Sequence, residues 1–172
     1  GRSGHLFAFQ KYDVIPDILC LAKAMGGGMP IGGFVSSTDN LNAFTNHPIL
    51  GHITTFGGHP VSAAAAFAHL SFLVEHPDIY KQADTKAQLF RQLIENHPLI
   101  KEIRQDGLIM AVDLDSSKLV FQFLKLALER GIMSDLFLFN EQSFRISPPL
   151  IISENEIKEA CKIIIECLNK CI

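Results

Sequence analysis

Charged residues and glycines are distributed very unevenly along this 172-residue chain, and this distribution limits the folds open to it. Only seven of the 33 charged residues lie in residues 1–76, whereas ten of the 12 glycines lie before residue 61. A segment with so little charge has little with which to cover a solvated surface, so we expect it to be buried against other chain. The sequence therefore predicts the end of a large domain at residues 1–76, a connecting helix at 77–97 and a small C-terminal domain at 98–172.

The overall composition narrows the functional classes. Hydrophobic residues make up 48% of the chain, which excludes a disordered protein, and a net charge of −3 favours neither a nucleic-acid nor a membrane-surface partner. No apolar run reaches the length of a membrane span. The chain begins without methionine, in what reads as the middle of a loop, so we expect a fragment of a longer protein.

Cysteines and histidines give no pattern typical of a metal site. No Cys-x-x-Cys pair is present, and no histidine stands at the spacing of a metal ligand. We therefore expect no bound metal. The cysteines fit reduced, mostly buried thiols of a cytoplasmic protein, with Cys20 in an apolar run and Cys161, Cys167 and Cys171 in the last predicted helix.

Hydrophobic periodicity and turn signals predict the secondary structure. Residues 18–22 form an apolar run typical of a buried strand. Residues 61–74 read as a helix that is apolar on nearly every side and therefore buried all round, which in a chain this short needs missing chain or a second subunit to cover it. The first half also contains a short helix at 5–10, a strand at 31–36 and a helix at 39–46 capped by Thr38 or Asp39.

The second half predicts a complete ββαββα pattern, which is a small α+β layer fold. A long helix at 78–96 precedes it. Ser153 and Glu156 have the spacing of a capping box for the final helix, which runs to about residue 171 with Ile157, Cys161, Ile164 and Leu168 inward. The other predicted elements are strands at 100–104 and 108–114 joined at Asp106-Gly107, a helix at 117–130, and strands at 132–139 and 143–147.

Lys23 is the first candidate for chemistry, because it ends the apolar run at 18–22 and is followed by Gly26, Gly27 and Gly28. Lysine is almost never buried without a partner. One use for it there is as an amine nucleophile, which burial helps to keep neutral and reactive toward a carbonyl. The alternative is a strand-end lysine that reaches solvent before a flexible loop.

Two further sites carry polar groups in suggestive settings. Thr54 and Thr55 lie in a glycine-rich loop before a predicted helix, where hydroxyl and backbone N–H groups suit a phosphate; the alternative is a pair that merely caps a turn. Arg145 stands between Phe144 and Ile146 on a predicted strand, where its planar guanidinium suits a carboxylate. A surface salt bridge is the alternative for Arg145.

These stretches together resemble one protein family. GRSGHLFAFQ at residues 1–10, DILCLAKAMGGG at 17–28, HITTFGGHP at 52–60 and FRISPPL at 144–150 are similar to the class III aminotransferases, which include ornithine, acetylornithine and 4-aminobutyrate aminotransferases. The motifs occur in the family's order and span nearly the whole chain. The resemblance implies an α/β fold: the C-terminal part of a fold-type I pyridoxal-phosphate transferase, with the end of the large α/β domain and a small α+β domain.

The resemblance also implies roles for individual residues. Lys23 would be catalytic and would form the Schiff base with pyridoxal 5'-phosphate. Thr55 would bind the cofactor phosphate of the neighbouring subunit, Thr54 would lie near substrate, and Arg145 would bind the substrate carboxylate. The family's aspartate at the pyridine nitrogen, its main phosphate loop and its stacking aromatic residue would all lie upstream of Gly1.

The expected function is transamination: an amino group moves from an amino acid or ω-amine to a 2-oxo acid, in a homodimer with shared active sites. One alternative keeps the fold but changes the reaction, to an aminomutase, epimerase or decarboxylase. Another is an inactive structural and dimerisation fragment. The amino donor and acceptor are not named by this sequence, because the family's substrate-selecting residues lie largely upstream.

Overall fold

The computed structural model describes residues 1–49, 51 and 53–171. His52, the first residue of the HITTFGGHP stretch, lies outside the described residues. The chain divides into two compact units. The lysine unit is Tyr12–Pro77, and the arginine unit combines Gly1–Lys11 with Asp78–Ile172. How residues 1–76, 77–97 and 98–172 belong to the domains of the whole protein stays a prediction.

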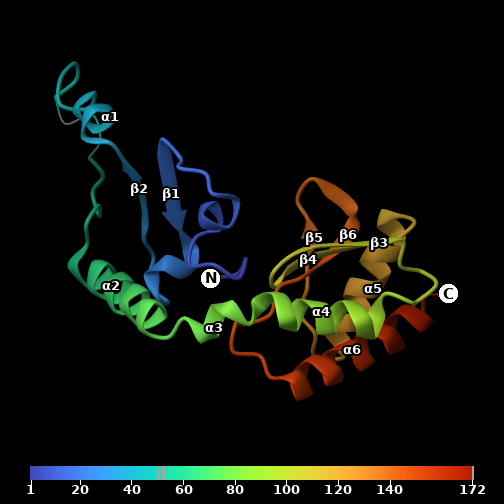
Figure 1. Cartoon of the computed structure of the whole chain (residues 1–172). Helices are drawn as coiled ribbons and strands as arrows, with labels where there is room; N and C mark the ends of the chain where they lie inside the picture. The colour runs from blue at the N-terminus through green and yellow to red at the C-terminus, as the bar shows by residue number, and fades with distance from the viewer. Residues whose placement is uncertain (50, 52, 172) are drawn as a thin grey trace. The chain divides into compact units, whose positions relative to one another are not determined.

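The lysine unit contains a two-stranded antiparallel sheet. β1 (Ile18–Ala22) pairs with β2 (Gly32–Ser36), and the short 3-10 helix η2 (Lys23–Gly26) follows β1 directly (Figure 1). The predicted strands at 18–22 and 31–36 are therefore confirmed. The described residues of this unit also form the α-helices α1 (Thr38–Asn42) and α2 (Pro60–Glu75).

Helix α1 starts one residue earlier than the sequence predicted. Its N-cap is Ser37, not Thr38 or Asp39, because Ser37 is extended and its Oγ accepts a hydrogen bond from the N–H of Asn40 at 3.2 Å. The predicted helix at 39–46 ends early, at Asn42.

Burial in the lysine unit is lower than the apolar sequence predicted. Residues of β1 alternate between exposed and half-buried, and Cys20 is exposed, so the expected buried strand is wrong for the described chain. Two strands without another layer have no means of burying both faces. Helix α2 has Ser62 as its one buried residue, and Phe67 is 74% exposed.

The arginine unit has the predicted ββαββα order. Its elements are α3 (Asp78–Lys81), α4 (Ala83–Ile94), β3 (Glu102–Asp106), β4 (Ile109–Asp113), α5 (Ser117–Glu129), β5 (Leu136–Phe137), β6 (Asn140–Ile146) and α6 (Glu154–Asn169). A helix was expected at 5–10, but the structure has the 3-10 helix η1 (Ala8–Tyr12), whose last residue is the first residue of the lysine unit. The single helix predicted at 78–96 is wrong. It is interrupted at Gln82, whose ψ of −3° departs from the α-helical value of about −42°.

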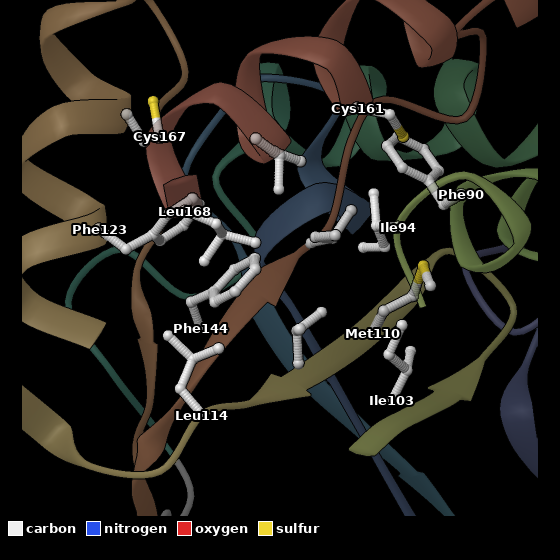
Figure 2. Close-up of a cluster of buried hydrophobic side chains, with 14 of the residues drawn as sticks. Phe90, Ile94, Ile103, Met110, Leu114, Phe123, Phe144, Cys161, Cys167 and Leu168 are labelled. Atoms are coloured by element: carbon white, nitrogen blue, oxygen red, sulfur yellow. The ribbon is translucent and has the colours of Figure 1, made fainter. Parts of the chain in front are cut away.

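The four strands form one antiparallel sheet in the order β3-β4-β6-β5. Helices α4, α5 and α6 lie on one face of this sheet, and their apolar side chains meet those of the strands (Figures 1 and 2). The rings of Phe123 on α5 and Phe144 on β6 have centroids 4.1 Å apart. The opposite face carries Arg145, because its neighbours Phe144 and Ile146 point into the core and successive strand residues alternate in direction.

Helix α6 confirms the predicted capping box. The Ser153 Oγ accepts from the Glu156 N–H at 3.3 Å, and the Glu156 carboxylate accepts from the Ser153 N–H at 2.8 Å. The four residues predicted to face inward are buried. Cys161, Cys167 and Cys171 are free, buried thiols; burial raises the pKa of Cys161 to about 12, so it stays protonated.

Two negative findings apply to the described residues. None of their helices combines the length and the apolar character needed to cross a membrane. No group of three or more histidine, cysteine, aspartate or glutamate side chains gathers there in a way that could hold a metal ion.

Candidate functional site

Lys23 lies at the junction of β1 and η2 in an unusual backbone conformation. Its φ is +55°, in the left-handed region that residues other than glycine seldom enter. Strain of this kind persists where the surroundings impose it, and it clusters at functional sites. Here the pairing of Ala22 with Gly32 and the turn bond from the Gly27 N–H to the Ala24 carbonyl, at 3.1 Å, fix both flanks of Lys23.

The side chain of Lys23 is exposed, and it makes no hydrogen bond or ion pair with any described residue. The expectation of a buried lysine is therefore wrong for the described chain, in which β1 belongs to a two-stranded sheet with β2. The amine is available to a ligand.

The glycines after Lys23 allow a close approach between η2 and α2. A Cβ atom on Gly27 would lie 3.0 Å from the His69 Cβ and 3.1 Å from the Ala65 carbonyl oxygen of α2. Gly27 also has a φ of +58°, so a larger residue would be both strained and crowded there. The turn after Lys23 is thus held against the long helix of the lysine unit.

Thr54 and Thr55 are exposed and precede α2. The Thr54 carbonyl accepts a hydrogen bond from the Gly57 N–H at 3.3 Å, and the loop reaches α2 through His59. His59 supplies no side-chain cap, so the N–H groups in the first turn of α2 have no capping side chain. The described residues contain no hydrogen bond between Lys23 and either threonine.

Arg145 lies on β6 in the arginine unit, opposite Ala111 on β4. Its backbone is well fixed: its N–H donates to the Asp135 carbonyl at 2.8 Å, and its own carbonyl accepts from the Ser134 hydroxyl at 2.5 Å. The guanidinium side chain is 41% exposed and donates no hydrogen bond to the described residues.

Asp135 is a neighbour of Arg145 that the sequence did not reveal. Its Oδ2 lies 3.7 Å from the Arg145 Nη2, while its Oδ1 accepts from the Leu136 N–H at 2.9 Å. The salt bridge that was the alternative for Arg145 therefore exists, but only as a loose pair. An aspartate ten residues away in a loop carries no sequence signal of this proximity, which depends on the β5–β6 hairpin.

A cavity of about 640 Å³ lies beside the C-terminal end of β6. Arg145, Ser134 and Asp135 line it with mainly apolar residues of the core. Such a mainly apolar lining suits the carbon chain of a small molecule, whose one charged group would face Arg145. The candidate residues are thus divided: Lys23, Thr54 and Thr55 belong to the lysine unit, and Arg145 to the arginine unit.

The chain belongs to the class III aminotransferase family. The family model described as "Aminotransferase class-III" matches residues 1–168. This confirms the resemblance drawn from the four sequence stretches.

Solved structures of similar proteins agree with this assignment. The chain is 30% identical to an acetylornithine aminotransferase from Elizabethkingia anophelis, over 98% of this chain and 43% of that one, with a TM-score of 0.82. The ornithine aminotransferase from Toxoplasma gondii ME49 is 30% identical over 98% of this chain and 40% of its own, with a TM-score of 0.83. The ornithine delta-aminotransferase of Plasmodium falciparum is 25% identical over 99% of this chain and 45% of its own, with a TM-score of 0.85. The chain therefore spans about two fifths of the length of these proteins.

Proposed function

We propose that the whole protein containing this chain is an aminotransferase that uses pyridoxal 5'-phosphate. It would move an amino group from an amino acid or ω-amine to a 2-oxo acid. The observation that carries the proposal is Lys23: an exposed lysine without a partner among the described residues, in a left-handed conformation, in a chain of the class III family. A lysine placed only for stability would have no reason to occupy a strained position and still remain unpaired.

The residues of the lysine unit fit this cofactor. An exposed primary amine suits its aldehyde, and the uncapped first turn of α2 with the Thr55 hydroxyl suits its phosphate. When bound, the cofactor supplies an electron sink that stabilises negative charge on the substrate Cα. The amine of Lys23 would hold the cofactor and, once the substrate amine displaces it, move the proton from the substrate Cα.

The remaining candidates bind and orient. Thr55 would hold the phosphate of the cofactor bound mainly to a second subunit, and Thr54 would contact substrate, so the active sites would be shared in a homodimer. Arg145 would bind the substrate carboxylate, because its guanidinium is half exposed and has its hydrogen-bond donors free of the described residues. Amino acids and 2-oxo acids would thus be the partners, and a cytoplasmic location fits the free thiols.

The test begins with the whole protein loaded with the cofactor. Borohydride reduction should attach the cofactor to the peptide that contains Lys23, and Lys23→Ala should lose both the attachment and the activity. Lys81→Ala, at an exposed position of α3, is the matched control and should retain both. Attachment at Lys11 or another lysine would contradict the assignment.

A second measurement separates transamination from the other reactions of the fold. Conversion of the amino donor should depend on added 2-oxo acid, and amino group transfer should be stoichiometric. Turnover without a 2-oxo acid would favour an aminomutase, epimerase or decarboxylase.

A further inference from the structure

Arg2, in the opening stretch of the chain, connects two distant segments of the arginine unit. Its Nη1 donates to the Leu108 carbonyl at 3.0 Å and to the Pro148 carbonyl at 2.9 Å. Leu108 lies in the turn between β3 and β4. Pro148 follows Arg145 by three residues, just after β6 ends. One side chain therefore ties the end of the Arg145 strand to the neighbouring hairpin.

The turn between β3 and β4 is shaped to receive this segment. The Leu108 N–H donates to the Arg2 carbonyl at 2.8 Å. A Cβ atom on Gly107 would lie 2.2 Å from that same carbonyl oxygen and 2.9 Å from the Ser3 Cα, so glycine is required there. Gly107 also has a φ of +56°, which favours glycine independently. The backbone of Arg2 is thus held as firmly as its side chain.

The charge of Arg2 is not balanced locally. Its guanidinium forms no ion pair with a carboxylate of the described residues. Burial, and secondly the positive charge of Arg145, lowers the pKa of Arg2, although an arginine remains protonated. Two guanidinium groups therefore act in the same region of the unit, where Asp135 is the one carboxylate ion-paired with either of them among the described residues. Excess positive charge favours an incoming anion.

We propose that Arg2 is a positioning residue for the carboxylate site: by holding the Pro148 and Leu108 carbonyls it fixes the end of β6, and with it the direction of the Arg145 guanidinium. The proposal rests on the proposed function, in which Arg145 binds the substrate carboxylate. Arg2 does not touch the carboxylate itself. Substitution of Arg2 should therefore change the binding only of ligands that carry a carboxylate.

The test uses the whole cofactor-loaded protein with Arg2→Gln, Arg2→Lys and Arg145→Lys. The probes are 4-aminobutyrate and n-butylamine, two donors that differ in one carboxylate, and glutarate, a dicarboxylate with no reacting group. Arg91→Gln is the matched control, because Arg91 likewise donates to a backbone carbonyl, that of Ile103, and to the Gln105 side chain at 2.9 Å. This control variant tests whether loss of another arginine-to-carbonyl hydrogen bond in the arginine unit has the same effect.

Arg2→Gln should weaken glutarate binding and raise the Michaelis constant for the donor 4-aminobutyrate, each by about tenfold, the loss expected for a charge-assisted hydrogen bond. Both kcat and the Michaelis constant for n-butylamine should stay within about twofold of their original values, since neither depends on a carboxylate contact. Arg2→Lys should give a smaller rise of the same kind, because one ammonium nitrogen can still donate to both carbonyls but is not held in the plane of a guanidinium. Arg91→Gln should lower Tm without this selectivity.

Two outcomes separate the positioning role from the proposed function. If Arg145→Lys weakens glutarate binding and neither Arg2 variant does, the positioning role of Arg2 is overturned and the carboxylate role of Arg145 stands. If Arg145→Lys also leaves glutarate binding unchanged, both are overturned. Should Arg2→Gln fail to fold, Arg2→Lys decides alone: equal changes toward 4-aminobutyrate and n-butylamine would overturn the proposal.

Discussion

Replacement of Phe144 by alanine should destabilise the arginine unit strongly. Phe144 is 1% exposed, packs against the ring of Phe123 at 4.1 Å, and stands directly before Arg145 on β6 (Figure 2). Buried phenylalanine-to-alanine changes cost about 3–5 kcal/mol, of which the lost ring pair accounts for about 0.5–1.5 kcal/mol. We expect Phe144→Ala to fall within that range, because the ring belongs to the buried cluster that also contains Phe123 and Phe90.

Phe139→Ala is the matched control. Phe139 precedes β6 by one residue but is 97% exposed, so its removal should change the free energy of unfolding by less than about 0.5 kcal/mol. Urea unfolding of the 172-residue chain, followed by circular dichroism at the helix band, measures both variants. With a slope of about 1–3 kcal/mol/M, Phe144→Ala should lower the urea midpoint by at least about 1 M, and Phe139→Ala should not move it.

The outcome that contradicts this reasoning is equal behaviour of the two variants. A loss below about 1.5 kcal/mol for Phe144→Ala would mean that the core between α5 and β6 is loosely packed. If Phe144→Ala leaves no folded protein, Phe144→Leu provides a milder change, expected at about 1–1.5 kcal/mol. That variant also tests function, because a shifted β6 should weaken carboxylate binding at Arg145.

Three further predictions rest on other measurements. Arg145→Lys in the whole protein should reduce kcat/KM for carboxylate-bearing donors by a factor that corresponds to a loss of about 1.5–3 kcal/mol in transition-state binding. We expect the low end of this range because the guanidinium is half exposed, and unchanged kcat/KM would contradict the carboxylate role. The hydrogen bond from the Ser153 N–H lowers the pKa of Glu156 from 4.5, so the capping box should stabilise α6 above about pH 4.5 and weaken as pH falls through the lowered pKa. Glu156→Gln should flatten this part of the plot of Tm against pH. Parallel plots for the two proteins would contradict the stabilising role of the capping box. A thiol reagent should modify Cys20 rapidly in the isolated 172-residue chain and leave the three buried thiols slow, whereas four equally fast thiols would contradict the assigned burial.

Local sequence signals were sufficient for most of the arginine unit. Alternation predicted β4, and the Ser153–Glu156 spacing marked the start of α6. Asp106-Gly107 marked the hairpin turn, although β3 spans Glu102–Asp106 and not the expected 100–104. Each of these depends on residues close together in the chain. The break at Gln82 and the shortness of β5, which was expected at 132–139 but spans Leu136–Phe137, had no such signal.

The exposure of β1 and Lys23 was the main departure from the sequence prediction, and its cause is physical. An apolar run predicts that something covers a strand, but it does not say whether the cover belongs to the same piece of chain. For Lys23 this reversed the expected environment. The pairing of Arg145 with Asp135 and the bonds of Arg2 were likewise out of reach, because each joins segments that only the folded sheet brings together.

Helix α2 indicates how the isolated chain should behave in solution. Val61 and Phe72 are separated by about three turns and so share one side of the helix, while Phe67 and Val74, about two turns apart, share another. All four side chains are exposed: Val61 is 56% and Phe72 50% exposed on one side, and Phe67 is 74% and Val74 58% exposed on the other. Cover on one side would leave the other apolar side in water, so we expect the missing part of the protein and a second subunit to divide these surfaces between them.

The isolated 172-residue chain should therefore sediment as a dimer or larger species, since so much exposed apolar surface drives association. Phe67→Glu should shift it toward monomer, whereas Phe139→Glu, the same change at a 97% exposed ring in the arginine unit, should have a smaller effect. The chain alone should bind pyridoxal phosphate weakly or not at all, because the family's main ring and phosphate ligands are expected upstream of Gly1. A monomer with a stable, stoichiometric cofactor absorbance band would refute both the expected association and the expected dependence on upstream residues.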